Sequence, residues 1–247
     1  MLGSFLLALV LSTVVTQIAV YSTTIYLHRA ATHRAVVLHP VVAWVFRFCI
    51  WLTTGIVPRE WVAVHRKHHA HTDEEGDPHS PYLEGFWKVQ LGNIFYYIRE
   101  LRDPGLVPKY ARDIRQDTWD RLLFDRGWLG LVTGIVVLCA TTGIGWGLFA
   151  AGLHAFMYVF VLSSSINGLC HHVGYRNFDN TATNVRIVAW LTGGEGLHNN
   201  HHGFPRSPKF SFLKGRRWEI DPGWWIIRFL SALKLATPLK TIEDATS

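Results

Sequence analysis

Residues 5–27 of the chain read FLLALVLSTVVTQIAVYSTTIYL, an uncharged run of 23 residues. A helix of about 20 apolar residues crosses the hydrocarbon core of a bilayer, so this run predicts a membrane span. Arg29 and Arg34 follow the run, whereas a secretory signal peptide carries its positive charge in front and a small-residue cleavage site behind. We therefore expect the span at about residues 5–27 to be retained.

A second uncharged zone extends from Gly127 to Ile166 and contains the glycine-rich segment TTGIGWG at 141–147. Its length and the glycines predict two further spans, at about 128–141 and 147–166, that are joined as a helical hairpin. All 24 Lys and Arg residues lie outside these two uncharged zones, as they should if both zones are in lipid.

Three other segments are predicted to lie at the membrane surface. Residues 41–57 are apolar but short, and a full crossing would bury the Arg47 guanidinium at a cost of a few kcal/mol, so a re-entrant or interfacial segment is expected. Residues 86–101 and 223–235 predict interfacial helices, with packing on a soluble domain as the alternative. In the first of these, the apolar face is expected to consist of Trp87, Leu91, Ile94, Ile98 and Leu101.

The positive charges flanking the spans predict that 28–126 and 167–247 face the cytoplasm. The expected fold is an all-α integral membrane protein in one domain, 1–247. It has about three transmembrane helices and one re-entrant or interfacial segment, and a cytoplasmic helical cap formed by 58–126 and 167–247. A bacterial cytoplasmic membrane is favoured over the endoplasmic reticulum.

The composition limits the classes of function. The net charge of +6 fits anionic lipid headgroups or an acidic protein partner, whereas no motif for nucleic acid is present. The three cysteines, Cys49, Cys139 and Cys170, are too widely spaced for a disulfide framework or a CxxC zinc site. Fourteen histidines are far more than average composition explains, and 13 of them lie in the two predicted cytoplasmic blocks.

Most of these histidines belong to four motifs: HRAATH at 28–33, HRKHH at 65–69, NGLCHH at 167–172 and HNNHH at 198–202. On a helix, positions i, i+3 and i+4 share a face, so the three histidines of each HxxHH motif can converge on one point. Asn167 and His171 also share a face. His28 and His33 lie about 140° apart on an ideal helix and can meet only where the helix frays or ends.

Nine histidines therefore converge, and nine neutral imidazoles exceed the needs of one zinc ion and suit a pair of first-row metal ions. Carboxylates close in sequence are expected to orient the rings: Asp73, Asp77, Asp179 and Glu195. The nine candidate ligands are His28, His33, His65, His68, His69, His171, His198, His201 and His202. Structural roles are expected for the other five histidines, which are His39, His71, His79, His154 and His172. His154 is also a functional candidate, because an ionisable group inside a membrane span often has a function.

The motifs HRAATH, EWVAVHRKHH, DPH at 77–79, NGLCHHVGYRNFD and GEGLHNNHHGFP, in this order, resemble the membrane-bound fatty acid desaturase family, in particular its stearoyl-CoA and acyl-lipid Δ9 branch. The resemblance implies two Fe ions held by the same nine histidines, with Asn167 reaching one iron through a water. Family members of the eukaryotic type have four spans, so a further span would be expected N-terminal to residue 1.

The reaction implied by the resemblance is O2-dependent introduction of a double bond into a fatty acyl chain that is bound to CoA, a carrier protein or a lipid. Two external electrons are needed, and a separate donor such as ferredoxin, rubredoxin or cytochrome b5 is expected to supply them. Trp61 and Phe204 flank two of the histidine motifs and are candidate walls of an acyl tunnel.

Other functions remain to be weighed against desaturation. A di-iron acyl hydroxylase or acetylenase of the same superfamily would use the same centre. A membrane haem-b electron carrier would need pairs of histidines within the spans, and only His154 lies in one. A zinc transporter would need more spans and intramembrane carboxylates, which the uncharged zones do not contain.

Overall fold

The structure, a computed structural model, describes residues 2–212, 218–242 and 244, so parts of the predicted cap at 213–217, 243 and 245–247 lie outside it. The described chain is mostly helical, with two short strands. The α-helices are α1 (Leu2–Ser22), α2 (Pro40–Thr54), α3 (Pro58–Ala70), α4 (Pro81–Glu84), α5 (Phe86–Glu100), α6 (Leu106–Tyr110), α7 (Gly127–Thr142), α8 (Ile144–Ala155), α9 (Ser164–Asn167), α10 (Arg186–Leu191), α11 (His198–Gly203) and α12 (Pro222–Ala232). There are also three π-helices, η1 (Thr23–Thr32), η2 (Asp120–Phe124) and η3 (Phe156–Ser163), and one 3₁₀-helix, η4 (Leu169–His171). The two strands are β1 (Val36–Leu38) and β2 (Ala236–Pro238).

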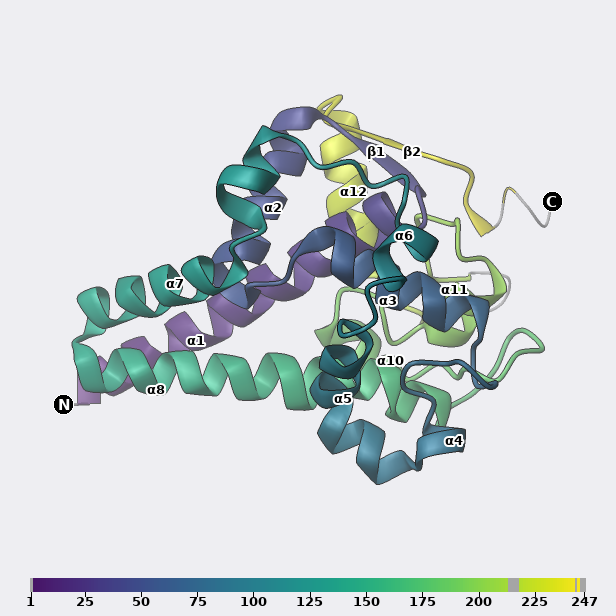
Figure 1. Cartoon of the computed structure of the whole chain (residues 1–247), viewed down its shortest axis with the longest axis horizontal. Helices are drawn as coiled ribbons and strands as arrows, with labels where there is room; N and C mark the ends of the chain where they lie inside the picture. The colour runs from purple at the N-terminus through teal and green to yellow at the C-terminus, as the bar shows by residue number, and fades with distance from the viewer. Residues whose placement is uncertain (1, 213–217, 243, 245–247) are drawn as a thin grey trace.

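Two continuous helices are long and apolar enough to cross a membrane, Leu2–Thr32 and Ile144–His171. They confirm helices at the spans predicted for 5–27 and 147–166, and both extend further than predicted. Between them in the sequence lies α7, a shorter apolar helix that covers the span expected at 128–141. Gly143, with a φ of 86°, makes the turn between α7 and α8, so the hairpin is tighter than the expected turn at 141–147. The helices α1, α7 and α8 extend together toward the end of the molecule that carries the N-terminus (Figure 1).

The predicted interfacial or re-entrant segment is the first half of a bent helix pair, in which α2 and α3 meet at 87°. Gly55 ends α2 in the left-handed conformation, with a φ of 65°, and Pro58 begins α3. This geometry fits a re-entrant loop or a broken span, which would be the third crossing. Arg47 is paired with Asp117 at 2.7 Å and Asp120 at 2.6 Å, which offsets the cost of partly burying its charge.

Helices α2 and α7 pack closely because α7 presents glycines to the backbone of α2. A Cβ at Gly130 would lie 1.9 Å from the Trp51 carbonyl oxygen, and one at Gly134 would lie 2.4 Å from the Leu52 carbonyl oxygen. Small residues that let helix backbones approach are a common means of association in lipid, where apolar side chains gain little from leaving one apolar medium for another.

A buried histidine ties three helices together inside the bundle. His154 on α8 lies 3.0 Å from Thr16 Oγ1 on α1 and 2.8 Å from the Thr53 carbonyl oxygen on α2. Both ring nitrogens thus have partners, which supports the structural role expected for this residue.

The helix α5 has two apolar faces rather than the single one predicted. Trp87, Leu91, Phe95 and Ile98 form an exposed stripe, which fits a membrane-surface helix. Ile94 instead faces a cavity, and Leu101, beyond the helix end, packs against a buried cluster of apolar residues.

The C-terminal strand pairs with a strand that directly follows the HRAATH motif. Helix α12 begins after Asp221, which accepts a hydrogen bond from Trp224 N, and it ends at Ala232, three residues before the predicted end. Strand β2 then pairs antiparallel with β1, a contact that the sequence did not predict.

We expect Gly130→Ala to lower the thermal stability of the detergent-purified protein, because the added methyl group overpacks the α2–α7 contact by about 1–3 kcal/mol. The matched control is Gly152→Ala on α8, where an added Cβ meets nothing within 4 Å. A thermal melt followed by intrinsic tryptophan fluorescence measures both. An unchanged melting temperature for Gly130→Ala would contradict close packing at this contact.

Candidate metal centre

The two HxxHH motifs are helical, as predicted, in α3 and α11. Figure 1 places these helices at the same end of the molecule, away from the tip of the α7–α8 hairpin. His198, His201 and His202 come from α11, and His65, His68 and His69 come from the last two turns of α3. The sequence spacing therefore turns six imidazoles toward one another.

The HRAATH motif reaches the same place by a different winding of the helix. His28 lies in the π-helix η1, and the His33 backbone N–H donates to the His28 carbonyl oxygen at 3.1 Å, a bond that spans five residues. Because this winding stacks residues five apart, the two rings lie on one face, with their centroids 4.9 Å apart. The separation of about 140° applies to an α-helix. Here the π-helix ends at Thr32, between the two residues, and His33 is its C-cap, which agrees with the expectation that the helix ends between them.

Nine imidazoles meet in two groups that are defined by which nitrogens lie within 4.8 Å of one another. The five-ring group contains residues from η1, α3 and α11: His28, His33, His65, His69 and His201. The four-ring group adds the residue from η4: His68, His171, His198 and His202. The nine members are the nine histidines predicted to be ligands.

The spacing of the nitrogens within each group fits ligands around a common ion. His28 Nε2 lies 3.0 Å from His201 Nε2, and His202 Nε2 lies 3.2 Å from His198 Nε2. With metal–nitrogen bonds of about 2.1 Å, adjacent ligands at 90° are separated by about 3.0 Å. The Nε2 atoms of His68 and His171 are buried without a hydrogen-bond partner, as expected of atoms reserved for a metal.

Three carboxylates hold rings from the side opposite to Nε2. His68 Nδ1 lies 3.0 Å from Asp77, and His171 Nδ1 lies 2.8 Å from Asp73. His28 Nδ1 lies 2.6 Å from Glu195. Such contacts fix the ring orientation and leave Nε2 free to bind a metal.

These carboxyl groups are ionised at neutral pH. Burial would raise the pKa of Asp77, but the hydrogen bond with His68 and the electrostatic effect of the neighbouring rings lower it well below its usual range. The pKa of Glu195 is also lowered, against burial, by the neighbouring His28. Asp179, the fourth predicted carboxylate, is exposed.

The imidazoles of α11 are held in the neutral form that a metal requires. Burial lowers the pKa of His198, His201 and His202 well below the usual value, and the surrounding rings lower it further. A neutral imidazole can bind a metal ion without first losing a proton.

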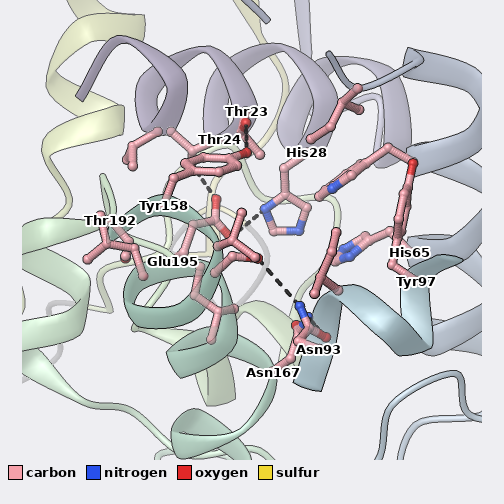
Figure 2. A pocket seen from close by; sticks show the side chains of 18 of the residues that line it. Thr23, Thr24, His28, His65, Asn93, Tyr97, Tyr158, Asn167, Thr192 and Glu195 are labelled. Atoms are coloured by element: carbon pink, nitrogen blue, oxygen red, sulfur yellow. Dashed lines mark hydrogen bonds and ion pairs between the residues drawn. The ribbon is translucent and has the colours of Figure 1, made fainter. Parts of the chain in front are cut away.

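A mainly apolar cavity with a volume of about 130 Å³ borders the five-ring group. Figure 2 shows His28 and His65 on one side of it, with Tyr97 near His65 and Tyr158 above Glu195. Much of its wall is formed by apolar side chains from η3, α9 and α5, including Val159, Leu162, Ile166 and Ile94. A lining of this kind suits apolar groups better than charged ones.

The other predicted site residues differ in where the structure places them. Trp61 lines the cavity and stacks on His65, with ring centroids 4.8 Å apart. Asn167 also lines the cavity and donates to Asn93 Oδ1 at 3.0 Å (Figure 2). It ends α9, and His171 lies in the 3₁₀-helix η4 that continues the same helical segment after Gly168, so the α-helical spacing expected for the two does not apply. Phe204 does not line the cavity and packs edge-on against Phe178.

A buried ion pair beside the five-ring group is not predicted by any pattern in the sequence. Arg29, which is fully buried, donates to Asp221 Oδ1 at 2.9 Å and stacks on Phe210 at 3.8 Å. Its neighbour in the chain is His28, so the pair anchors η1 to the start of α12. The sequence pattern indicates only that Arg29 is a charge flanking the first span, and its position next to His28 is the sequence signal for the further role.

Four further histidines lie outside both groups. His39 caps α2 by accepting from Val41 N, His71 lies 3.1 Å from Tyr110 Oη, and the exposed His172 stacks on Phe86. His79 is buried, stacks on His68 and lines the cavity. The first three fit the expected structural roles, whereas His79 lies close enough to the centre to support His68.

Comparison with known proteins identifies relatives with a common activity. Residues 4–222 match the family model described as fatty acid desaturase. The sn-1 stearoyl-lipid 9-desaturase of Anabaena variabilis is 33% identical over 227 residues, which are 89% of this chain and 79% of the relative. Delta-9 acyl-lipid desaturase 2 of Arabidopsis thaliana is 33% identical over 90% of this chain and 71% of its own length. Icosanoyl-CoA 5-desaturase of Limnanthes douglasii is 32% identical over 90% of this chain, which spans only 62% of that relative.

We expect metal analysis of the purified protein to give about two first-row metal ions per chain, one for each group of rings. His198→Ala in the four-ring group and His201→Ala in the five-ring group should each reduce the content toward one. Plasma mass spectrometry on protein of known concentration measures this. A content near zero in active protein would contradict the assignment of the centre.

Proposed function

The chain belongs to the fatty acid desaturase family, and from this we propose that it is an O2-dependent di-iron enzyme that introduces a double bond into a fatty acyl chain. The observation that carries the proposal is the five-ring group of imidazoles at the wall of an apolar cavity. Iron is inferred from the family and the chemistry, since imidazoles alone would favour copper or zinc.

Bound iron would supply the redox chemistry that removes two hydrogens from an unactivated acyl chain, with O2 and two external electrons, and releases water. The protein supplies position and exclusion of water. The cavity binds the chain by burying its methylene groups, at about 0.8 kcal/mol each. His28 and His65 form the wall where the reacting carbons must lie, and Trp61 holds the ring plane of His65 by stacking.

The carboxylates keep the histidines in position through the reaction. Asp77 and Asp73 accept from the Nδ1 of His68 and His171, and Glu195 lies 2.6 Å from the Nδ1 of His28. These contacts fix which nitrogen of each ring would point to the metal. The neighbouring ion pair of Arg29 and Asp221 holds η1 against α12, which keeps His28 beside Glu195.

Two related reactions are the alternatives. A hydroxylase or an acetylenase of the same superfamily would use the same nine rings and the same cavity, and the names of the relatives favour desaturation. Those names include both acyl-lipid and acyl-CoA substrates, so either form, or a chain on a carrier protein, is a candidate for this enzyme.

We place the enzyme in a membrane as a multi-pass protein, with the metal centre on the cytoplasmic side of a bacterial cytoplasmic membrane. The exposed apolar stripe of α5 and the exposed Trp225 on α12 would lie among the lipids at that surface. Electrons would come from a donor protein such as ferredoxin, rubredoxin or cytochrome b5.

The first test is lipid analysis of a host that expresses the chain. The wild type should produce a new double bond, and gas chromatography with mass spectrometry gives its position. His201→Ala should reduce the product below detection, because it removes a buried ligand of the five-ring group. The exposed His172 lies outside both groups, so His172→Ala should retain the product. Full activity of His201→Ala would refute the proposed centre.

A second test probes the cavity. Val159→Phe should narrow it and lower the yield of unsaturated product by roughly tenfold or more, because small displacements of the reacting carbons are costly. The metal content should stay at that of the wild type. Val136→Phe, on the exposed face of α7, is the control for the same change in size. A normal product profile from Val159→Phe would place the acyl chain elsewhere.

A further inference from the structure

The two groups of rings differ in their access to the outside. Four of the five rings in the five-ring group border an opening: His28 and His65 line the apolar cavity, and His33 and His69 line a polar cleft on the protein surface beside Arg66. In the four-ring group, only His202 borders either opening. An ion in the five-ring group would therefore be reached from two directions and an ion in the four-ring group from one.

Burial of the rings differs less between the two groups. In the four-ring group His68, His171 and His198 are at most 1% exposed and His202 is partly buried. In the five-ring group His28, His65 and His201 are buried, and His33 and His69 are partly buried. A ligand exchanges when its ring swings away and water takes its place, and enclosed rings have little room to do so.

Carboxylates reinforce this difference. Two of the four rings in the four-ring group are backed by carboxylates, Asp77 behind His68 and Asp73 behind His171. In the described part of the chain, only His28 of the five-ring group has such a partner, Glu195. Groups that back a metal-binding imidazole typically change metal affinity by about 10- to 100-fold.

The backing carboxylates also differ in their neighbours. Glu195 lies close to the buried Arg29 guanidinium, which offsets part of its charge. Asp73 is held by neutral hydroxyls, those of Ser80 at 2.7 Å and Thr181 at 2.5 Å, and keeps its full charge beside His171. The four-ring group thus has more uncompensated negative charge with which to hold a cation.

We propose that the two metal positions are unequal: the ion held by the five-ring group exchanges readily, whereas the ion held by the four-ring group is retained. The fifth ring of the exchangeable position adds a bond, but release depends on how easily the rings open, and two of them border the polar cleft. Mild chelation should therefore yield a protein that carries one ion per chain. This inference rests on the di-iron centre proposed above.

The experiment follows iron release from the detergent-purified, iron-loaded protein under anaerobic reducing conditions. Excess ferrozine is added, and its iron(II) complex is recorded by absorbance over time. We expect two phases, each of about one iron per chain, with rates that differ about tenfold or more. Protein recovered between the phases should contain about one iron by mass spectrometry.

Two variants assign the phases. Asp77→Asn removes a charge behind the four-ring group and should speed the slow phase about tenfold, with the fast phase unchanged. Glu195→Gln should speed only the fast phase. Asp179→Asn, at an exposed carboxylate outside both groups, is the control and should change neither rate. If Asp77→Asn does not fold, Asp73→Asn tests the same group through His171.

The outcomes separate this inference from the function on which it rests. Release of two irons in a single phase, or a slow phase that responds to Glu195→Gln and not to Asp77→Asn or Asp73→Asn, would overturn the inequality and leave the di-iron centre intact. Active wild-type protein without iron would instead overturn the centre itself.

Discussion

The mutual approach of nine imidazoles is the constraint on which the rest of the structure depends. The nitrogens of each group lie within 4.8 Å of one another, and the Nε2 atoms of His68 and His171 are buried without a hydrogen-bond partner, which is costly unless a cation binds them. Several features serve this approach: the π-helix that aligns His28 with His33, the 87° bend that delivers α3, and the carboxylates that turn His68 and His171. Each of these features would lower the stability of an ordinary helical bundle. Each is explained if the rings are positioned to bind a pair of metal ions.

The apolar part of the molecule supports the same end by other means. Lipid offers little hydrophobic gain for bringing helices together, so the bundle uses close backbone contact at Gly130 and Gly134, and polar ties through His154. The cavity lies where this bundle meets the histidine-bearing helices, with η3, α9 and α5 forming its wall. The apolar surface that would bind a hydrocarbon chain therefore lies directly beside the polar rings that would bind metal.

The cavity and the polar cleft approach the centre from different sides, and this arrangement separates the reagents of the proposed reaction. The acyl chain belongs to the apolar cavity beside His28 and His65, whereas polar species have access at His33, His69 and His202. Because the four-ring group is enclosed on most sides, it can serve as the fixed half of the pair while the five-ring group faces the substrate.

The sequence by itself determined the uncharged helices, the two HxxHH faces and the list of nine histidines, because helical periodicity and the exclusion of charge from lipid are local properties of the chain. The tertiary structure alone decided how those rings divide into five and four, that Arg47 and Arg29 have buried or partly buried partners, and that Phe204 lies away from the cavity. It also replaced an α-helical angle between His28 and His33 with a π-helical one. These features depend on contacts between residues far apart in the chain, and no periodicity in the sequence records which distant groups will meet.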